Sequence, residues 1–86
     1  MDPQSLLEFM VKALVDHPDQ VNISETQGEI VTVIEVRVAD EDTGRVIGRE
    51  GRIVNALRTV AKAAGAKDKK KVTVEIISRE KEEEKR

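Results

Sequence analysis

The segment from Ile30 to Ala39 constrains the fold most, because it is dense in β-branched side chains that alternate between two faces. One face carries Ile30, Thr32, Ile34, Val36 and Val38, and the other carries Val31, Val33, Glu35 and Arg37. Successive residues of a strand point to opposite sides of a sheet. The segment therefore predicts a strand with one covered, apolar side and one side open to water.

Helical spacing of apolar residues marks two longer segments. The first follows a capping-box pattern, with Ser5 as N-cap and Glu8 three residues later. It is expected to end near Asp16, because a following proline disfavours helical geometry. The second starts at Arg52 and is expected to end at Gly65 in a left-handed conformation. Phe9, the only aromatic residue, is expected in the core.

The remaining elements complete an α-β-β-α-α-β order. Short strands are predicted at residues 20–24 and 72–77, and a very short helix at 45–47, capped by Asp40 or Asp42. Strands on either side of a helical crossover can lie parallel, and the other pair can form a hairpin. The expected fold is an α+β two-layer sandwich, a three-stranded mixed sheet covered on one face by three helices.

We expect residues 1–78 to form a single domain. Residues 79–86 carry four acidic and four basic side chains and are expected to be a flexible, charged tail.

The residue types present exclude most kinds of chemistry. The chain has no cysteine and a single histidine, His17, so it offers no thiolate or histidine-rich metal site and no cysteine nucleophile. No nucleophile–base pair is evident, so neither enzymatic activity nor a cofactor is expected. Asp40, Glu41 and Asp42 are more typical of helix caps and solvated loops than of metal ligands. The lack of a long apolar run predicts a cytoplasmic protein that does not insert into membranes.

The charges are distributed very unevenly. Residues 1–44 carry a net charge of −8, residues 45–71 carry +7 and residues 72–86 carry −1. Polyanion binding depends on a local basic surface rather than on the total charge. Within the basic segment, Arg58 and Lys62 lie one helical turn apart, and they either extend this surface or only solvate the helix.

The stretch GRVIGREGRIV places two glycines, Gly48 and Gly51, among three arginines, Arg45, Arg49 and Arg52. Glycine lets another molecule approach the backbone closely, and a helix N-terminus attracts anions. The stretch lacks the Lys-Ser/Thr pair of a P-loop and the strand and three glycines of a dinucleotide site. It therefore predicts either a phosphate-binding loop of another kind or an ordinary turn between two helices.

The segment VIGREGRIV resembles the G-x-x-G motif of the KH domain, which it matches at Ile47, Gly48, Gly51 and Val54. The resemblance extends over residues 6–77 in the type II element order, and it is greatest to the small bacterial single-KH proteins of the KhpA group. It implies a protein that binds single-stranded RNA, with the loop clamping the backbone of about four nucleotides. The absence of further aromatic residues argues against RNA modules that depend on base stacking.

The resemblance also implies roles for individual residues. Those expected to hold the RNA backbone are Gly48, Arg49, Glu50 and Gly51, with Arg52 and Arg45 beside them. Those expected to shape the base-binding groove are Ile47 and Val54 on its floor, Lys69, Lys70 and Lys71 in the opposite loop, and Val72 to Val74 through their backbone.

Two of these assignments have alternatives. Ile47 and Val54 could simply pack in the core. Glu50 is expected to point outward and to lower RNA affinity modestly, because like charges a few ångströms apart repel by roughly 1 kcal/mol in water. It could instead cap the following helix and weaken phosphate binding further.

A lone four-nucleotide site is weak, so a second domain held nearby is expected. The resemblance implies self-association, or pairing with a larger KH-containing partner (KhpB, also called Jag), and a role as an RNA chaperone or regulator linked to cell elongation and division. The alternative is a protein-interaction or dimerisation module that keeps the KH fold and binds little RNA.

Overall fold

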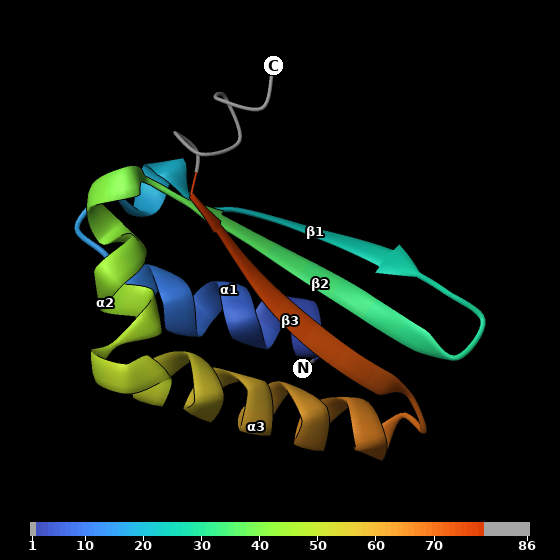
Figure 1. Ribbon diagram of the computed structural model, residues 1–86. Coiled ribbons are helices and arrows are strands. Elements are labelled where there is room, and N and C mark those ends of the chain that lie inside the picture. Colours follow the sequence, from blue (N-terminus) through green and yellow to red (C-terminus); the bar gives the residue numbers. More distant parts are fainter. Residues whose placement is uncertain (1, 79–86) are drawn as a thin grey trace.

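The computed structural model describes residues 2–78, and the predicted tail of residues 79–86 lies outside them. Figure 1 shows six main elements in the expected order. They are α1 (Pro3–Leu14), β1 (Asn22–Gln27), β2 (Val31–Val38), α2 (Thr43–Ile47), α3 (Arg52–Lys67) and β3 (Lys71–Ser78). Single 3-10 turns occupy Pro18–Gln20, Asp40–Asp42 and Arg49–Gly51. The predicted α+β class and element order are confirmed.

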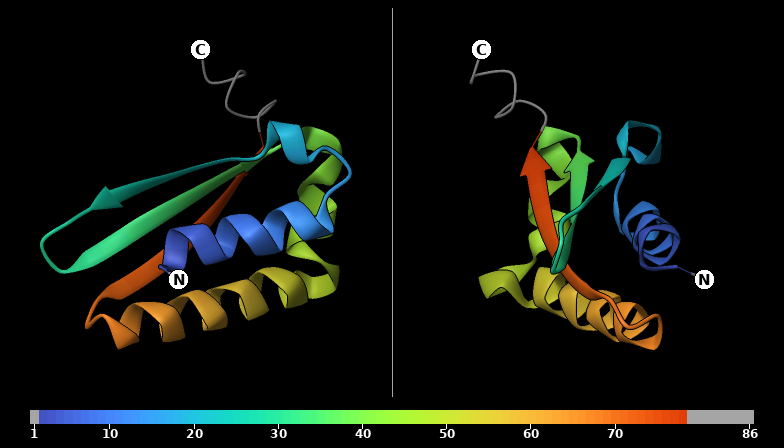
Figure 2. Two further views of the ribbon diagram at one scale, coloured as in Figure 1. Left: turned by 180° about the vertical axis from the view of Figure 1, so that it is seen from behind. Right: turned by 90° about the vertical axis from the view of Figure 1, so that its right-hand side faces the viewer.

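The sheet has the order β1-β2-β3. β1 pairs with β2 in antiparallel fashion as a hairpin, whereas β2 and β3 are parallel, with Ile34 opposite Val74. The parallel pair requires a crossover, which α2 and α3 provide. Figure 2 shows α1 and α3 on the same side of the sheet, with α3 running beside β3. β3 is therefore an edge strand, with β2 on one side and no strand on the other. It lies next to α3.

The core lies between the helices and the covered face of the sheet. Its buried members are Leu7 and Val11 of α1, Ile34, Val36 and Val38 of β2, Val46 of α2, Leu57 and Ala61 of α3, and Val72 and Val74 of β3. The predicted faces of β2 are correct except at Ile30, which lies before the strand and is 77% exposed.

Phe9 was expected in the core, and this prediction is wrong. Its side chain is 68% exposed. With about 100° of rotation per helical residue, Phe9 lies far round α1 from the buried residues Leu7 and Val11.

The start of α1 also differs from the prediction. Asp2, not Ser5, is the N-cap, and its carboxylate accepts a 2.9 Å hydrogen bond from the Ser5 backbone N–H. The following Pro3 occupies the first helical turn, where its missing N–H is tolerated. Hydrogen bonds from the Ser5 side chain and then from its backbone N–H lower the pKa of Asp2 below its ordinary value of 3.8.

Gly65 does not end α3 in a left-handed conformation, because the helix continues to Lys67 and positive φ first occurs at Lys69, at 60°. A Cβ atom on Gly65 would lie 2.5 Å from Val72 Cγ2 and 3.0 Å from the Lys70 carbonyl oxygen. This glycine is therefore required for close packing between α3 and β3.

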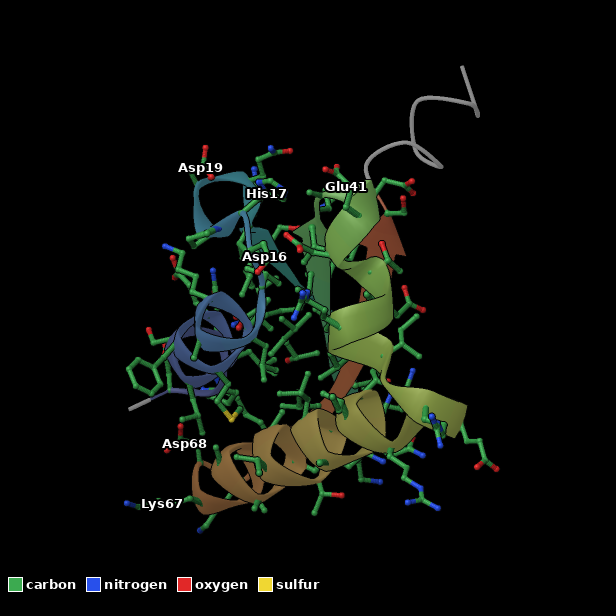
Figure 3. All side chains as sticks on the ribbon, turned by 90° about the vertical axis from the view of Figure 1, so that its left-hand side faces the viewer. Asp16, His17, Asp19, Glu41, Lys67 and Asp68 are labelled. Carbon is green, nitrogen blue, oxygen red and sulfur yellow. The ribbon has the colours of Figure 1, made fainter. Side chains whose placement is uncertain are left out.

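Asp42 was considered as a helix cap, but its side chain makes no cap bond to α2. It is 1% exposed and accepts hydrogen bonds from the backbone N–H groups of Asp16, at 3.1 Å, and His17, at 2.9 Å. Figure 3 shows Asp16, His17 and Glu41 at this junction between the end of α1 and the start of α2. Asp42 therefore joins two segments that are 25 residues apart or more.

Candidate nucleic-acid interface

The backbone between α2 and α3 takes conformations that favour glycine. Gly48 has φ 76° and ψ 175°, and Gly51 has φ 75° and ψ 15°. A Cβ atom on Gly48 would lie 2.7 Å from Ile53 Cγ1 and 3.0 Å from Ile53 N. The loop of residues 48–51, called here the glycine loop, therefore folds tightly onto the first turn of α3.

Two backbone donors at the tip of the glycine loop have no partner among the residues that the structure describes. The N–H groups of Gly48 and Gly51 donate to carbonyl oxygens of Gly44 and Gly48, at 2.8 and 3.2 Å. The N–H groups of Arg49 and Glu50 meet no acceptor among residues 2–78. Successive free N–H groups beside a helix N-terminus form a concavity that suits an anion.

The charged side chains of the glycine loop are exposed. Arg49 and Glu50 form no ion pair with any described residue, and Glu50 makes no hydrogen bond to the first turn of α3. Glu50 has φ 56° and ψ 27°, a left-handed conformation that non-glycine residues rarely adopt. Within the described part of the chain, the loop thus presents one cation, one anion and two free N–H groups to solvent.

Arg45 pairs with Asp16 rather than with a group of the glycine loop, whereas Arg52 directly follows the loop as the first residue of α3. Arg45 forms a 3.1 Å ion pair with Asp16, and at about 100° per residue it lies roughly opposite Ile47 on α2. Arg52 lines an apolar hollow between α1 and α3.

Ile47 and Val54 differ in exposure. Val54 is 6% exposed and belongs to the core, whereas Ile47 is 36% exposed at the end of α2. Val46, between Arg45 and Ile47, is the residue by which α2 is anchored in the core. Ile47 is thus the more accessible of the two predicted groove residues.

The side chains of Val72 and Val74 are buried, so these residues can offer a ligand only their backbone. Arg58 crosses from α3 to β3 and donates from Nε to the Val74 carbonyl oxygen, at 3.2 Å. Its Nη1 donates to Asn55 Oδ1, at 3.3 Å. Sequence reasoning left the role of Arg58 open, because nothing local indicates that it reaches the edge strand.

Lys69, Lys70 and Lys71 lie at the opposite end of α3 from the glycine loop (Figure 1). α3 has 16 residues and is therefore about 24 Å long. A hollow of about 370 Å³ opens at this end, lined by Lys62, Ala66, Lys70, Lys71 and Val72. Two basic parts of the predicted site, the glycine loop and Lys69 to Lys71, therefore lie at opposite ends of α3.

α3 has two different flanks. The flank beside β3 carries Arg58 and Lys62. The flank beside α1 is apolar, and together with α1 it lines a hollow of about 340 Å³. The residues around this hollow are Met10, Leu14, Arg52, Ile53, Ala56, Leu57 and Val60. These apolar positions follow helical spacing in the sequence, yet Leu14 and Val60 are more than a third exposed.

Within the described part of the chain, no helix is both long enough and apolar enough to cross a bilayer. The same residues contain no cluster of three histidine, cysteine or acidic side chains arranged to hold a metal ion.

Comparison with known proteins identifies the family. Residues 4–76 match the family model described as "KhpA/KhpB, KH domain". The RNA-binding protein KhpA of Clostridium acetobutylicum is 54% identical over 74 residues, which is 86% of this chain and 99% of that protein. The proteins of the same name from Clostridium perfringens and Aquifex aeolicus are 50% and 45% identical over 86% of this chain, covering 99% and 94% of their own lengths.

No solved structure matches the chain significantly. The relatives are named for binding rather than for a reaction, and the family is non-catalytic, in agreement with the prediction that the chain is not an enzyme. The match over residues 4–76, the element order and the G-x-x-G loop between two helices all agree, and the chain belongs to the KhpA/KhpB family of KH domains.

Proposed function

We propose that the protein binds single-stranded RNA as a non-catalytic KH module. The observation that carries this proposal is the glycine loop beside the N-terminus of α3. There the N–H groups of Arg49 and Glu50 and the side chain of Arg49 have no hydrogen-bond or ion-pair partner among residues 2–78. The relatives named RNA-binding protein KhpA support RNA as the ligand.

In this proposal the glycine loop holds the phosphate backbone and the bases lie toward β3. Ile47 offers an accessible apolar surface at the end of α2, and β3 offers the backbone of an edge strand at Val72 and Val74, where Arg58 already bonds to the Val74 carbonyl oxygen. A KH loop of this kind clamps about four nucleotides. Arg45 serves mainly to hold α2 against Asp16, and Arg52 contributes positive charge at the rim of the loop.

The test compares binding of a random-sequence single-stranded RNA pool to the wild-type protein and to the Arg49→Asp/Glu50→Asp variant, at low and moderate salt. The variant keeps both glycines and makes the loop acidic. Binding by the wild type should weaken as salt rises, and the logarithm of its binding constant should fall by about 0.7 per phosphate contacted for each tenfold rise in salt concentration. Binding should collapse in the variant.

Lys12→Glu is the matched control. It makes the same change in net charge on α1, at an exposed lysine whose only ion pair among residues 2–78 is with Glu8. Equal loss of binding in both variants would point to a general charge effect. Unchanged binding in the loop variant would show that the glycine loop does not hold the RNA.

We further propose that the apolar flank of α3 mediates self-association or pairing with a larger KH-containing protein of the KhpB/Jag kind. Its support is the hollow between α1 and α3, on the other side of α3 from β3. When two RNA-binding domains are held together, RNA bound to one domain is at a high effective concentration for the other. A cytoplasmic RNA chaperone or regulator with a role in cell elongation and division fits this arrangement.

The alternative is an interaction module that binds little RNA, and the same apolar flank favours it. Sedimentation equilibrium of Val60→Glu, with Thr59→Glu as control, tests whether the flank mediates self-association. If Val60→Glu becomes monomeric while the loop variant leaves RNA binding unchanged, the interaction module is the better description.

A further inference from the structure

Ile53, the second residue of α3, lies against the backbone of the glycine loop. The three atoms nearest to a Cβ on Gly48 would all belong to Ile53, namely Cγ1 at 2.7 Å and Cβ and the backbone N at 3.0 Å. A Cβ on Gly51 would make only ordinary contacts, 3.8 Å from Val54 Cγ1 and 3.9 Å from Asn55 Nδ2. The glycine loop is therefore tightly packed at Gly48 and loosely packed at Gly51.

The backbone of the glycine loop needs such support. Gly48, at φ 76° and ψ 175°, has a conformation that is essentially restricted to glycine, and Glu50 is left-handed. Strained conformations persist only where the surrounding structure holds them. The Gly51 N–H closes the loop through its 3.2 Å bond to the Gly48 carbonyl oxygen. Among the described residues, no side chain caps the N-terminus of α3, so the packing of Ile53 adds side-chain support that a cap would otherwise give.

The position of Ile53 is set by the core rather than by the loop. Its side chain is half-buried and packs against the core cluster. It also lines the hollow between α1 and α3, together with Met10 and Leu14 of α1. Figure 2 shows that α1 runs alongside α3. Ile53 thus connects the glycine loop to the packed interior of the protein.

We propose that Ile53 is a positioning residue for RNA binding. It does not touch the RNA, but it holds Gly48 in the conformation that presents the N–H groups of Arg49 and Glu50 to a phosphate. Without this support the loop takes other shapes as well, and the apparent RNA affinity falls in proportion to the time spent in the binding shape. The inference rests on the proposed function, because the loop that Ile53 supports is the proposed RNA site.

The experiment measures the affinity of a labelled random-sequence RNA of four nucleotides for the wild type, Ile53→Ala and Ile53→Val. An RNA of about four nucleotides occupies one KH loop, so self-association adds no second contact. Ile53→Ala removes the Cγ1 atom that lies nearest to Gly48, and the affinity should fall about tenfold. Ile53→Val keeps Cβ and both γ-carbons, and its affinity should stay within about twofold of the wild type.

Val60→Ala is the matched control. It removes an apolar side chain from the same hollow, about two turns further along α3. Its affinity for the four-nucleotide RNA should equal that of the wild type. An equal loss in Val60→Ala and Ile53→Ala would overturn the proposal, because the effect would then be general to the hollow. Urea titration checks that each variant is folded under the binding conditions.

Inorganic phosphate gives a second readout that a purely structural role would not change. In the wild type, phosphate should shift the amide NMR signals of Arg49 and Glu50. The same phosphate concentration should shift these signals less in Ile53→Ala. Equal shifts in the two proteins would overturn the proposal, even if Ile53→Ala is less stable to urea.

The contact can also be tested from the loop, in case Ile53→Ala does not fold. Gly48→Ala places a Cβ against Ile53 and should shift the NMR signals of the Ile53 methyl groups. Gly51→Ala is the control, because it has the same sign of φ but no close contact, and it should leave these signals in place. An Ile53 signal that Gly48→Ala does not move would contradict the proposal.

Failure of this inference differs from failure of the proposed function. If the wild type binds RNA through the glycine loop but folded Ile53→Ala binds equally well, Ile53 is not a positioning residue and the proposed function stands. If the wild type binds no RNA, or if Arg49→Asp/Glu50→Asp binds as well as the wild type, the proposed function itself is refuted.

Discussion

Arg58 of α3 donates a hydrogen bond from Nε to the carbonyl oxygen of Val74, on the free edge of β3, at 3.2 Å. An edge strand presents unpaired backbone groups. Here the protein's own side chain satisfies one of them in the region where we propose that RNA bases lie. Arg58 thus connects α3, the helix that follows the glycine loop, to the edge strand β3.

Replacement of Arg58 should measure what this bridge contributes to stability. Arg58→Met keeps the aliphatic stem and removes the donor, and a typical hydrogen bond contributes about 0.5–1.5 kcal/mol. We therefore expect the free energy of unfolding, measured by urea titration, to fall by about 1 kcal/mol. Lys62→Met, one turn further along α3, is the control and should change stability less. Equal effects in the two variants would mean that the bridge adds nothing measurable.

Gly65 and Gly44 should respond to alanine with opposite signs. A Cβ atom on Gly65 would lie 2.5 Å from Val72 Cγ2, so Gly65→Ala overpacks the contact between α3 and β3 and should destabilise the protein by about 1–3 kcal/mol.

A Cβ atom on Gly44 would meet nothing within 4 Å, so Gly44→Ala should stabilise α2 by roughly 0.5–1 kcal/mol. Thermal unfolding followed by circular dichroism checks both, and a destabilised Gly44→Ala would contradict the argument.

The strand pattern and the glycine motif were sufficient to predict the fold class, the sheet pairing and the start of α3. Both signals are local, since β2 alternates along its own length and α3 follows directly after Gly51. The role of Gly65 was mispredicted, because the contact that requires a glycine there comes from Val72, which belongs to another element.

Side-chain placement was predicted less well wherever it depends on contacts between distant segments. Asp42 looks like an ordinary helix cap in the sequence, yet it bonds to the end of the α1 segment. Arg45 belongs to the same basic stretch as Arg49, but Arg45 lies on α2 and pairs with Asp16. Neither the bond from Arg58 to Val74 nor the hollow beside Lys62 and Lys70 could be predicted, because both depend on how closely α3 approaches β3.

Of the acidic residues that the structure describes, Asp42 should be the most sensitive to substitution. Its carboxylate is 1% exposed and accepts two backbone N–H groups. Asp42→Ala leaves both donors without that partner, and each unsatisfied buried group costs about 1–3 kcal/mol. Allowing for partial hydration, we expect a loss of about 2–4 kcal/mol in the free energy of unfolding. The neighbouring Glu41→Ala is the control and should stay within about 0.5 kcal/mol of the wild type. If Asp42→Ala also lowers the free energy of unfolding by less than about 0.5 kcal/mol, this carboxylate does not hold the junction together.

Glu50 combines an unfavourable backbone conformation with an unfavourable charge, and two substitutions separate them. Its φ of 56° and ψ of 27° lie in the left-handed region, which costs most residues roughly 1–2 kcal/mol and asparagine less. Glu50→Asn should therefore raise the melting temperature by about 4–8 °C for each kcal/mol gained, whereas Glu50→Gln, which keeps the backbone cost, should not. Both substitutions remove a carboxylate that repels phosphate by roughly 1 kcal/mol, so both should tighten RNA binding by about fivefold. Calorimetry measures the melting temperature, and RNA titration measures the affinity, of the wild type, Glu50→Asn and Glu50→Gln. If Glu50→Gln stabilises the protein as much as Glu50→Asn does, the backbone argument fails, and if neither tightens binding, Glu50 lies away from the phosphate path.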